Sequence, residues 1–397
     1  SDGTGAAPAP PAATPPTEVC GAAQPRALPH MFEFDGSASY VLKRQARALT
    51  ALEGDTDRNR FLVASLELRD ANELQVLDFN EDTNEVVCMR AYTQPHETWH
   101  MASCPAPEHV ELVTTVYSTG TEQRATLWRL DGLDDASERS DGTGAAPAPP
   151  AATPPTELLQ LGGAMRLGEC RGVLWNAVLP EQVCVLREGS LSAFQLSHGG
   201  AASSAAELAS ISLAEQDWRG ASFACGRWDP HHAHALALGC ERALVTLDMR
   251  TMKQAHAVPA AHQQALTGID YNPNKPHVLL TCADDYALRY WDLRKPAAPL
   301  LTQKAHSHSV SAALYNRFHD QLVLSAGTDS AVKLWRVASI SSAPSSFEPE
   351  EEAAAADSDA DGLVKAFDEH DQSIFGLAWS AADAWIFASL SLDGRAI

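Results

Sequence analysis

The chain has 397 residues, of which 29 are Lys or Arg and 51 are Asp or Glu, so its net charge is −22. Such an acidic surface repels phosphate backbones, and we expect no direct binding to nucleic acid. No apolar run approaches the ~18 residues of a membrane-spanning helix, so we expect no membrane span. The eight cysteines include no CxxC pair and the chain has no Asn-x-Ser/Thr sequon, which indicates free thiols in a reducing, cytoplasmic compartment.

The N-terminal segment, residues 1–39, consists mainly of Pro, Ala, Gly and Ser, so we expect it to be disordered. Its first 18 residues recur without change at 140–157. The second copy falls within residues 131–160, which we expect to be a low-complexity, disordered insert. The sequence leaves open whether this repeated block is a genuine expansion.

Short apolar runs separated by turn residues predict β-strands through the rest of the chain, 40–397. Before residue 262 they group into four small sheets, or blades: blade one from runs at 40–49, 61–66 and 74–79, blade two at 96–128, blade three at 161–196 and blade four at 219–250. Blades three and four each keep a carboxylate six residues before an apolar side chain. These pairs are Glu188 with Phe194 and Glu241 with Leu247.

A polar pattern then recurs three times. A Ser or Thr lies 19 residues after each starting histidine, an Asp lies 23 residues after it and, in two copies, a Trp lies 29 residues after it. The sets are His262, Thr281, Asp285 and Trp291; His306, Ser325, Asp329 and Trp335; and His370, Ser389 and Asp393. Repeats near this length are typical of propeller blades. An unpaired buried polar group costs about 1–3 kcal/mol, so we expect each set to form an internal hydrogen-bonded tetrad.

The length of the chain predicts the number of blades. Without the expected inserts 131–160 and 339–364, residues 40–397 leave 302 residues, or about 43 for each of seven blades. We therefore expect an all-β, seven-bladed WD40 β-propeller with a disordered N-terminal segment and two low-complexity loop inserts. The seventh blade ends inside its third strand, so we expect residues 40–44 to supply its outer strand and cover the exposed edge.

The same residue types also occur in catalytic triads. An active site is built once, however, whereas this set occurs three times. No P-loop, metal-ligand set or isolated nucleophile elbow is present, so we expect no enzyme activity and no cofactor. His231, His232 and His234 could suggest a metal site, but no further ligand is in view.

The second insert contains an acidic stretch, 347–362, that has no basic residue. A solvated loop is the simpler interpretation. The alternative is a regulated segment, because Ser358 precedes Asp359 and Asp361, a context that acidophilic kinases favour.

Several motifs resemble the EARP- and GARP-complex-interacting protein family. They are QARALT at 45–50, GRWDPHH at 226–232, DYNPNK at 270–275, HSHSV at 306–310, HDQLVLS at 319–325, VASISS at 337–342 and EHDQSIFGLAWSAADAWIFASLSLDGR at 369–395. The resemblance covers about 45–395 apart from the inserts, and it is strong from 219 onward. The Pro/Ala block and Leu247, where the family has Trp, depart from it.

The resemblance implies a non-enzymatic scaffold that binds multisubunit vesicle-tethering complexes. It implies a cytoplasmic protein that reaches endosome and trans-Golgi membranes through these partners. Its role would be in endosomal recycling and endosome-to-Golgi retrograde traffic.

Propellers bind partners through loops, because their strands are occupied in packing. The turns between the first and second strands of blades four to seven collect His and basic groups on one face. The residues that we expect to bind the partner there are Asp229, His231, His232, Asn274, Lys275, Arg317 and His319. The alternative is that these residues only form turns. If they bind, reversing the charge of Lys275 and Arg317 should weaken binding without lowering the melting temperature.

A second functional hypothesis rests on Trp291, Asp292 and Arg294. They form a WDxR sequence that is similar to the box by which some WD proteins dock on the adaptor of a cullin–RING ubiquitin ligase. The protein would then be a substrate receptor of such a ligase. The alternative is that Arg294 only caps the end of a strand.

Overall fold

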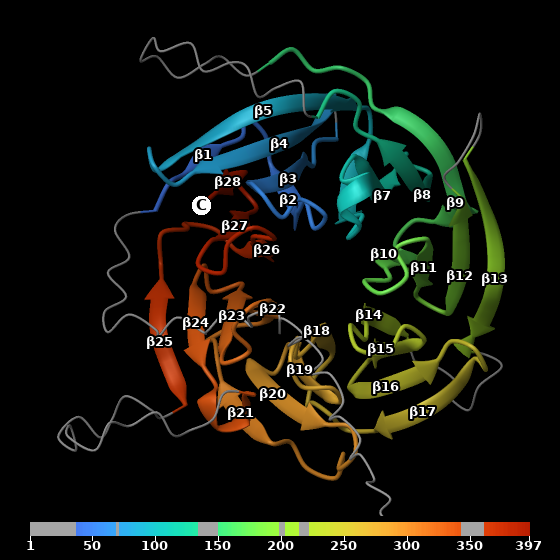
Figure 1. Cartoon of the computed structure of the whole chain (residues 1–397), viewed down its shortest axis with the longest axis vertical. Coiled ribbons are helices and arrows are strands. Elements are labelled where there is room, and N and C mark those ends of the chain that lie inside the picture. The colour runs from blue at the N-terminus through green and yellow to red at the C-terminus, as the bar shows by residue number, and fades with distance from the viewer. Residues whose placement is uncertain (1–36, 69–70, 134–149, 198–202, 214–221, 343–360) are drawn as a thin grey trace, which may run out of the picture. The chain divides into compact units, whose positions relative to one another are not determined.

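The computed structural model describes residues 37–68, 71–133, 150–197, 203–213, 222–342 and 361–397. Residues Ser37–Ile397 form one compact unit. Within it, the strands form seven four-stranded antiparallel sheets arranged around a common centre (Figure 1). The predicted seven-bladed, all-β propeller is therefore confirmed. Residues 1–36 and 343–360, including Ser358, lie outside the described residues, so the predicted disorder and regulation there stay predictions.

Each blade runs from an innermost strand, which we call strand a, to an outermost strand, d. Blade one is β2 (Ala46–Ala51), β3 (Asn59–Ser65), β4 (Asn72–Asn80) and β5 (Glu85–Gln94). Blade two is β6 (Glu97–Ser103), β7 (Leu112–Ser118), β8 (Glu122–Arg129) and β9 (Thr156–Arg166). Blade three is β10 (Cys170–Trp175), β11 (Gln182–Arg187), β12 (Ser190–Ser197) and β13 (Ser204–Ser212).

Blades four to seven continue the same order around the ring. Blade four is β14 (Phe223–Trp228), β15 (Ala235–Cys240), β16 (Ala243–Asp248) and β17 (Lys253–Val258). Blade five is β18 (Leu266–Tyr271), β19 (Val278–Ala283), β20 (Ala287–Asp292) and β21 (Leu301–Lys304). Blade six is β22 (Val310–Tyr315), β23 (Leu322–Gly327), β24 (Val332–Arg336) and β25 (Gly362–Phe367). Blade seven is β26 (Ile374–Trp379), β27 (Phe387–Ser391), β28 (Arg395–Ala396) and β1 (Tyr40–Val41). Two short 3-10 turns, η1 (Pro107–His109) and η4 (Ala338–Ile340), also fall within the described residues.

The burial of each strand follows its place in the blade. Every residue of the second strands β3, β19 and β23 is buried, because neighbouring blades cover both of their faces. The outer strand β13, of sequence SAAELASIS, is mostly exposed and carries little apolar signal. For this reason the predicted spans of blades three and four, 161–196 and 219–250, left out their outer strands β13 and β17.

The predicted insert 131–160 was also too long. Strand β9 begins at Thr156 and pairs with β8 as the outer strand of blade two. Its Leu161 and Met165 are buried in the core between blades two and three. The repeated Pro/Ala block obscured the start of this strand. The second predicted insert, 339–364, likewise overlaps η4 and the first residues of β25.

The N-terminal strand closes the ring, as the sequence predicted. Tyr40 pairs with Ala396 and Val41 with Arg395, so β1 forms the outer strand of blade seven beside β28 (Figure 1). The backbone N–H of Leu42 also donates to the carbonyl of Gly394 at 2.9 Å. Gly394 has a φ of +82°, and a Cβ there would collide with the backbone oxygen of Arg44. Glycine therefore permits the close approach of the two ends of the propeller.

Candidate functional site

The four polar residues predicted for blade five lie in one hydrogen-bonded chain. His262 Nδ1 is 2.9 Å from Asp285 Oδ1, and His262 Nε2 is 2.8 Å from Thr281 Oγ1. The indole Nε1–H of Trp291 donates to the same Thr281 oxygen at 3.0 Å. A neutral imidazole that carries its proton on Nδ1 uses each donor and acceptor once along this chain.

Blade six repeats the arrangement. His306 Nδ1 is 2.8 Å from Asp329 Oδ1, and His306 Nε2 is 2.8 Å from Ser325 Oγ. Trp335 Nε1–H donates to Ser325 Oγ at 2.8 Å. The tetrad therefore tolerates either Ser or Thr as the hydroxyl residue.

The electrostatics favour a neutral histidine and an ionised aspartate in both tetrads. Burial lowers the pKa of His262 and of His306, and the hydrogen bonds to Asp285 and Asp329 oppose this only in part. For the two aspartates, burial acts to raise the pKa, but hydrogen bonds from a backbone N–H and from the histidine outweigh it. Their pKa values are therefore lowered. This is the charge state that the hydrogen-bonded chain requires.

Blade seven departs from the predicted pattern. His370 Nε2 is 2.8 Å from Ser389 Oγ, as expected, but His370 Nδ1 is 2.9 Å from Ser391 Oγ instead of Asp393. Ser391 in turn donates to the Asp393 carboxylate. The prediction of a direct His370–Asp393 bond was wrong, because the hydroxyl of Ser391 stands between the two groups.

The degenerate blades replace the polar chain with apolar packing. Phe194 is buried in the core between blades two and three, and Leu247 in the core between blades three and four. Blade two keeps one part of the tetrad, which sequence analysis missed: Trp128 Nε1–H donates to Thr115 Oγ1 at 2.8 Å. These two residues are 13 apart, whereas the hydroxyl and indole of blades five and six are 10 apart. The turn between β7 and β8 is no longer than that between β19 and β20, but β7 and β8 are themselves longer strands, and this changed spacing hid the pair.

The tetrads lie where a substrate does not reach them. The side chains of His262 and His306 are 0% exposed. Thr281 and Ser325 are also fully buried, and the hydroxyl of each accepts a hydrogen bond from an indole. The geometry of these residues fits packing between strands and does not provide an accessible nucleophile.

The turns between strands a and b form one face of the propeller, which we call the a–b face. In blades three to seven, a side-chain oxygen at the start of this turn accepts hydrogen bonds from one or two backbone N–H groups further along. The accepting residues are Asn176, Asp229, Asn272, Asn316 and Ser380. Several of them also bond to the next blade, as Asn176 does to the Ala233 carbonyl at 2.8 Å. The turn-forming interpretation therefore accounts for much of the pattern at these positions.

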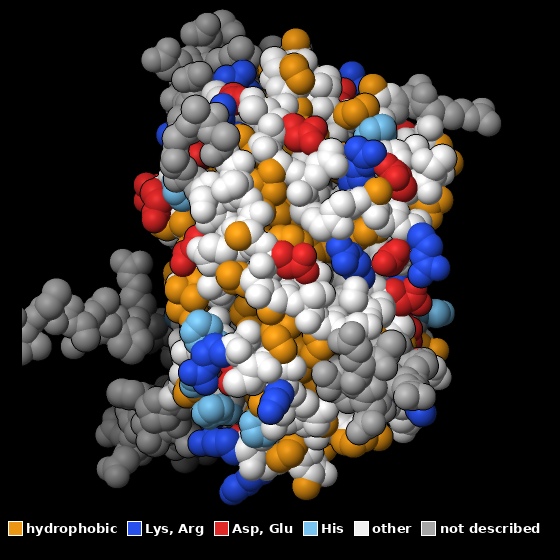
Figure 2. Space-filling view, turned by 90° about the vertical axis from the view of Figure 1, so that its right-hand side faces the viewer, with side chains coloured by type: hydrophobic (Ala, Val, Ile, Leu, Met, Phe, Trp, Pro, Cys, Tyr) orange, Lys and Arg blue, Asp and Glu red, His pale blue; other side chains and the backbone are white. Residues whose placement is uncertain are grey.

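The histidines predicted for the partner face have contacts within it. His231 Nε2 lies 2.9 Å from the Asn272 carbonyl oxygen, and His232 Nδ1 lies 2.9 Å from Asp229 Oδ2. The His319 ring packs against Trp385, with ring centroids 5.0 Å apart. Asn274 is exposed. Figure 2, a view from the side of the ring, shows His and Lys/Arg side chains gathering toward its lower end, where blades four and five lie.

The two basic residues predicted for this face are engaged inside the molecule. Lys275 Nζ donates to the carbonyls of Ile340 at 2.9 Å and Ser341 at 3.3 Å. Arg317 is ion-paired with Glu53 at 2.8 Å. Charge reversal at either position would break these contacts. The expectation of an unchanged melting temperature therefore does not follow from the structure.

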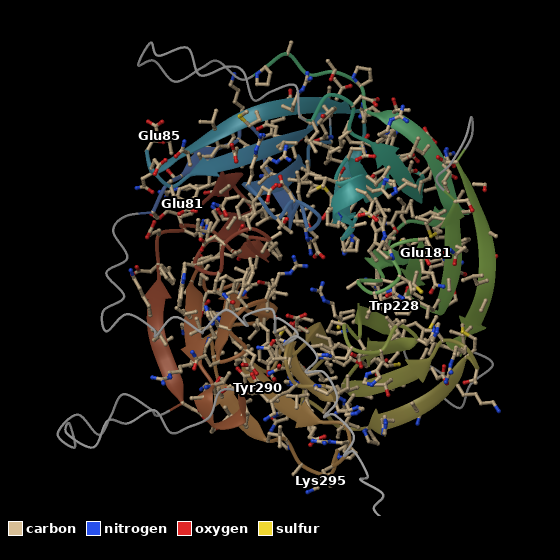
Figure 3. The ribbon with its side chains drawn as sticks, in the orientation of Figure 1. Glu81, Glu85, Glu181, Trp228, Tyr290 and Lys295 are labelled. Carbon is tan, nitrogen blue, oxygen red and sulfur yellow. The ribbon has the colours of Figure 1, made fainter. Side chains whose placement is uncertain are left out.

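The centre of the ring contains a cavity of about 350 Å³, lined by the inner strands of all seven blades. Side chains that bear nitrogen atoms reach into it, and Trp228 lies at its edge (Figure 3). Two ion pairs face this cavity: Arg317 with Glu53, and Arg227 with Asp270 at 3.0 Å. Burial acts to raise the pKa of Glu53, but Arg317 and Arg227 outweigh it and lower the value. For Asp270 burial prevails, and the pKa is raised. Opposite charges therefore compensate one another across the cavity.

The WDxR residues have mainly local contacts. Trp291 belongs to the tetrad of blade five, and Arg294 donates to the Asp292 carboxylate through Nε at 2.9 Å and Nη2 at 2.7 Å. Arg250 repeats this contact with Asp248 in blade four. The Arg294 side chain is 63% exposed. The arrangement fits the interpretation that Arg294 caps a strand end.

The described part of the chain contains no group of three or more His, Cys, Asp or Glu residues that could hold a metal ion, and His231, His232 and His234 form no such group. Its cysteines are unpaired. Among the described helices, none is long and apolar enough to cross a membrane.

Seven four-stranded blades around a central cavity, with buried Asp–His–Ser/Thr–Trp tetrads in blades five and six, define a WD-repeat β-propeller. Residues 35–335 match the family described as EIPR1 beta-propeller, and residues 362–397 match the WD domain, G-beta repeat. The chain belongs to the EIPR1 beta-propeller family, which confirms the resemblance found in the sequence.

Known relatives match over nearly their whole length. The "EARP-interacting protein homolog" of Gekko japonicus is 33% identical over 383 residues, which cover 92% of this chain and 96% of that protein. The "EARP and GARP complex-interacting protein 1" of Rattus norvegicus is 34% identical with the same coverage. The Homo sapiens protein of that name is 32% identical, again with 92% and 96% coverage.

Proposed function

We propose that this protein is a non-enzymatic adaptor that binds vesicle-tethering complexes of the EARP and GARP type. The observation that carries the proposal is the similarity to proteins named for that interaction, which extends over 92% of this chain and 96% of those proteins. The proposed place of action is the cytoplasmic side of endosome and trans-Golgi membranes, reached through these partners. The proposed role is in endosomal recycling and endosome-to-Golgi retrograde traffic.

The fold supports a binding role. The hydrogen-bonding groups of its inner strands are occupied within the blades, and its tetrads are buried, so loops provide most of the accessible chemistry. The proposal requires no cofactor and no catalytic residue. Its direct ligand is protein, because a net charge of −22 disfavours nucleic acid.

The a–b face is the proposed partner surface. Of its predicted residues, His232 has a side chain that is 48% exposed, and Asn274 is exposed. Phe318 and Trp385, which flank His319, add exposed aromatic surface at 46% and 42%. Aromatic side chains are enriched among the residues that dominate binding energy in protein interfaces. This surface therefore combines His232 and Asn274 with Phe318 and Trp385.

The test is affinity purification of the tagged full-length chain from cells, with mass spectrometry of the bound proteins. The proposal expects subunits of a tethering complex to dominate, and it expects Phe318→Ala with His232→Ala to reduce them. Thr121→Ala provides the control, because Thr121 is exposed in the turn between β7 and β8, at the end of the strands opposite the a–b face. Absence of tethering subunits from the wild-type sample would refute the proposal.

A ligase substrate receptor is the second candidate, because the Arg294 side chain is 63% exposed at the end of β20. The same purification discriminates between the two. Recovery of a cullin–RING adaptor that is lost in Arg294→Ala would favour this candidate. Arg250→Ala, which removes the matching contact in blade four, is the control.

A further inference from the structure

Each innermost strand carries a β-bulge near its start. In every blade, the register between strands a and b shifts around one residue that has no partner on strand b. The seven unpaired residues are Arg47, Trp99, Arg171, Ala224, Thr267, Ser311 and Phe375. They occupy the same level of the propeller, at the end of the inner strands opposite the a–b face. Bulges re-aim the side chain of the extra residue. The residues that directly follow the bulge in blades two, four and five, His100, Cys225 and Gly268, line the central cavity, so the bulge residues lie around one mouth of it.

The ring is divided into two halves by residue size. Blades seven, one, two and three contribute Phe375, Arg47, Trp99 and Arg171, which are large. Blades four, five and six contribute Ala224, Thr267 and Ser311, which are small. The hydroxyls of Thr267 and Ser311 already donate to the carbonyls of Val310 and Ala326. Four consecutive blades therefore contribute aromatic or basic side chains to this mouth, and the other three contribute small ones.

Arg47 lies between two aromatic rings. Its guanidinium carbon is 4.5 Å from the ring centroid of Phe375 in blade seven and 5.3 Å from that of Trp99 in blade two. Both distances are within the range of a cation–π contact. Three residues from three different blades, separated by up to 328 positions in the sequence, thus form one cluster. We call it the Arg47 cluster.

The charge of Arg47 is not neutralised by the described residues. None of them places an acceptor within hydrogen-bonding distance of this guanidinium, and burial alone lowers its pKa. Arg171, the other arginine of the ring, differs because it lies 3.8 Å from the Glu188 carboxylate. An arginine that has aromatic neighbours but no carboxylate is complementary to an external anion.

We propose that the Arg47 cluster is a docking site for an acidic peptide segment of a protein partner. A carboxylate of the peptide accepts hydrogen bonds from the Arg47 guanidinium. A neighbouring apolar side chain of the peptide packs on Trp99, which is 39% exposed, and over the small residues of blades four to six. Trp and Arg are the residue types that most often dominate the energy of an interface.

The same chemistry fits an anionic lipid surface less well. Binding to a membrane surface requires a cluster of Lys and Arg side chains. This mouth has one unpaired arginine, and the only other arginine of the ring is paired with Glu188. The site is also independent of the proposed tethering function, because it lies at the opposite end of the inner strands from the a–b face.

The test uses the full-length chain and a phage-displayed library of random peptides. Selected peptides are synthesised with a fluorescent label, and their affinity is measured by fluorescence polarisation for wild type, Arg47→Gln, Trp99→Ala and Arg250→Gln. Arg250 is the control, because it is an exposed arginine in the turn that follows β16. Melting temperatures of all four proteins establish that they are folded. Vesicles that contain phosphatidylserine are added as competitors.

The proposal expects selected peptides rich in Asp and Glu. Arg47→Gln and Trp99→Ala should each weaken their binding at least about tenfold, and Arg250→Gln should leave it unchanged. Selection of no acidic peptide would overturn the proposal, as would equal binding by folded Arg47→Gln. Direct binding of the vesicles that is lost in Arg47→Gln would assign the site to lipid instead.

Discussion

The imidazole of His370 hydrogen-bonds the hydroxyl of Ser391, 2.9 Å away, where the corresponding histidines of blades five and six bond a carboxylate directly. Ala283 and Gly327 occupy the place of Ser391 in those two blades. Neither has a hydroxyl that could stand between the imidazole and the aspartate. One side chain therefore changes the tetrad of blade seven without changing its spacing.

This difference predicts unequal effects of two neighbouring serines. Ser389→Ala removes the only partner of His370 Nε2 and should destabilise the protein by about 1–3 kcal/mol. Ser391→Ala should cost less than about 1 kcal/mol, because Ala283 holds that place in blade five and Asp393 remains nearby. Urea denaturation of the two variants provides the comparison. A larger loss for Ser391→Ala would contradict this account of blade seven.

Buried histidines predict a loss of stability in acid. The pKa values of His262, His306 and His370 are lowered by burial, and that of His100 is lowered to about 4. The unfolded chain therefore binds more protons than the folded chain below about pH 6.5, so stability falls as the pH drops through that value. For His100 alone the loss at pH 5 is at most about 2 kcal/mol, which follows from the lowering of its pKa from 6.5 to about 4.

The measurement is the denaturation midpoint between pH 7.5 and pH 5. His100→Gln should flatten this dependence, because it removes a group that protonates only on unfolding. Asp285 and Asp329, whose pKa values are lowered, lose their contribution only below about pH 4 and do not affect this window. Stability that is constant from pH 7.5 to pH 5 in wild type would exclude the predicted charge states.

The closure of the ring predicts a specific role for one glycine. Gly394→Ala should lower the melting temperature strongly, because the new Cβ would collide with the backbone of Arg44 in addition to the cost of a positive φ. Gly120→Ala is a matched control: Gly120 also has a positive φ, +88°, but nothing lies within 4 Å of a Cβ there. If both substitutions lower the melting temperature equally, the close contact between Gly394 and the Arg44 backbone does not contribute to stability.

Lys275 should act as a structural residue. Lys275→Glu removes two charge-assisted hydrogen bonds to the carbonyls of Ile340 and Ser341, so we expect a loss of about 1–3 kcal/mol. Lys295→Glu makes the same charge change at an exposed side chain on the rim of blade five (Figure 3), where little effect is expected. Differential scanning fluorimetry distinguishes the two. If Lys275→Glu and Lys295→Glu have equal melting temperatures, Lys275 is not structural and becomes a candidate for partner binding again.

Most of the fold could be predicted from the polar repeat and its spacing. His262, Thr281, Asp285 and Trp291 could be placed together from sequence, because the tetrad uses donor and acceptor types that recur at fixed offsets. Outer strands such as β13 could not be predicted, since Ala and Ser on an exposed edge give neither an alternating nor a continuous apolar pattern. The hydroxyl of Ser391 was overlooked because it falls between two positions of the pattern.

The surface was less predictable than the core. Lys275 and Arg317 stand in turns and look available in the sequence, but their partners Ile340 and Glu53 are 65 and 264 residues away. The Arg47 cluster joins blades one, two and seven, and the bulge that re-aims these side chains leaves no mark in the composition. The sequence offered one clue to the bulge. In blades five to seven, the bulged residue is the one that directly follows the first apolar residue of strand a.

Binding to purified tethering complex tests the central claim most directly. The full-length chain is mixed with a reconstituted complex of the EARP type, and the mixture is analysed by size-exclusion chromatography with light scattering. The account predicts co-elution at a fixed stoichiometry. It is contradicted if the two elute separately while the folded chain instead co-elutes with a cullin–RING adaptor.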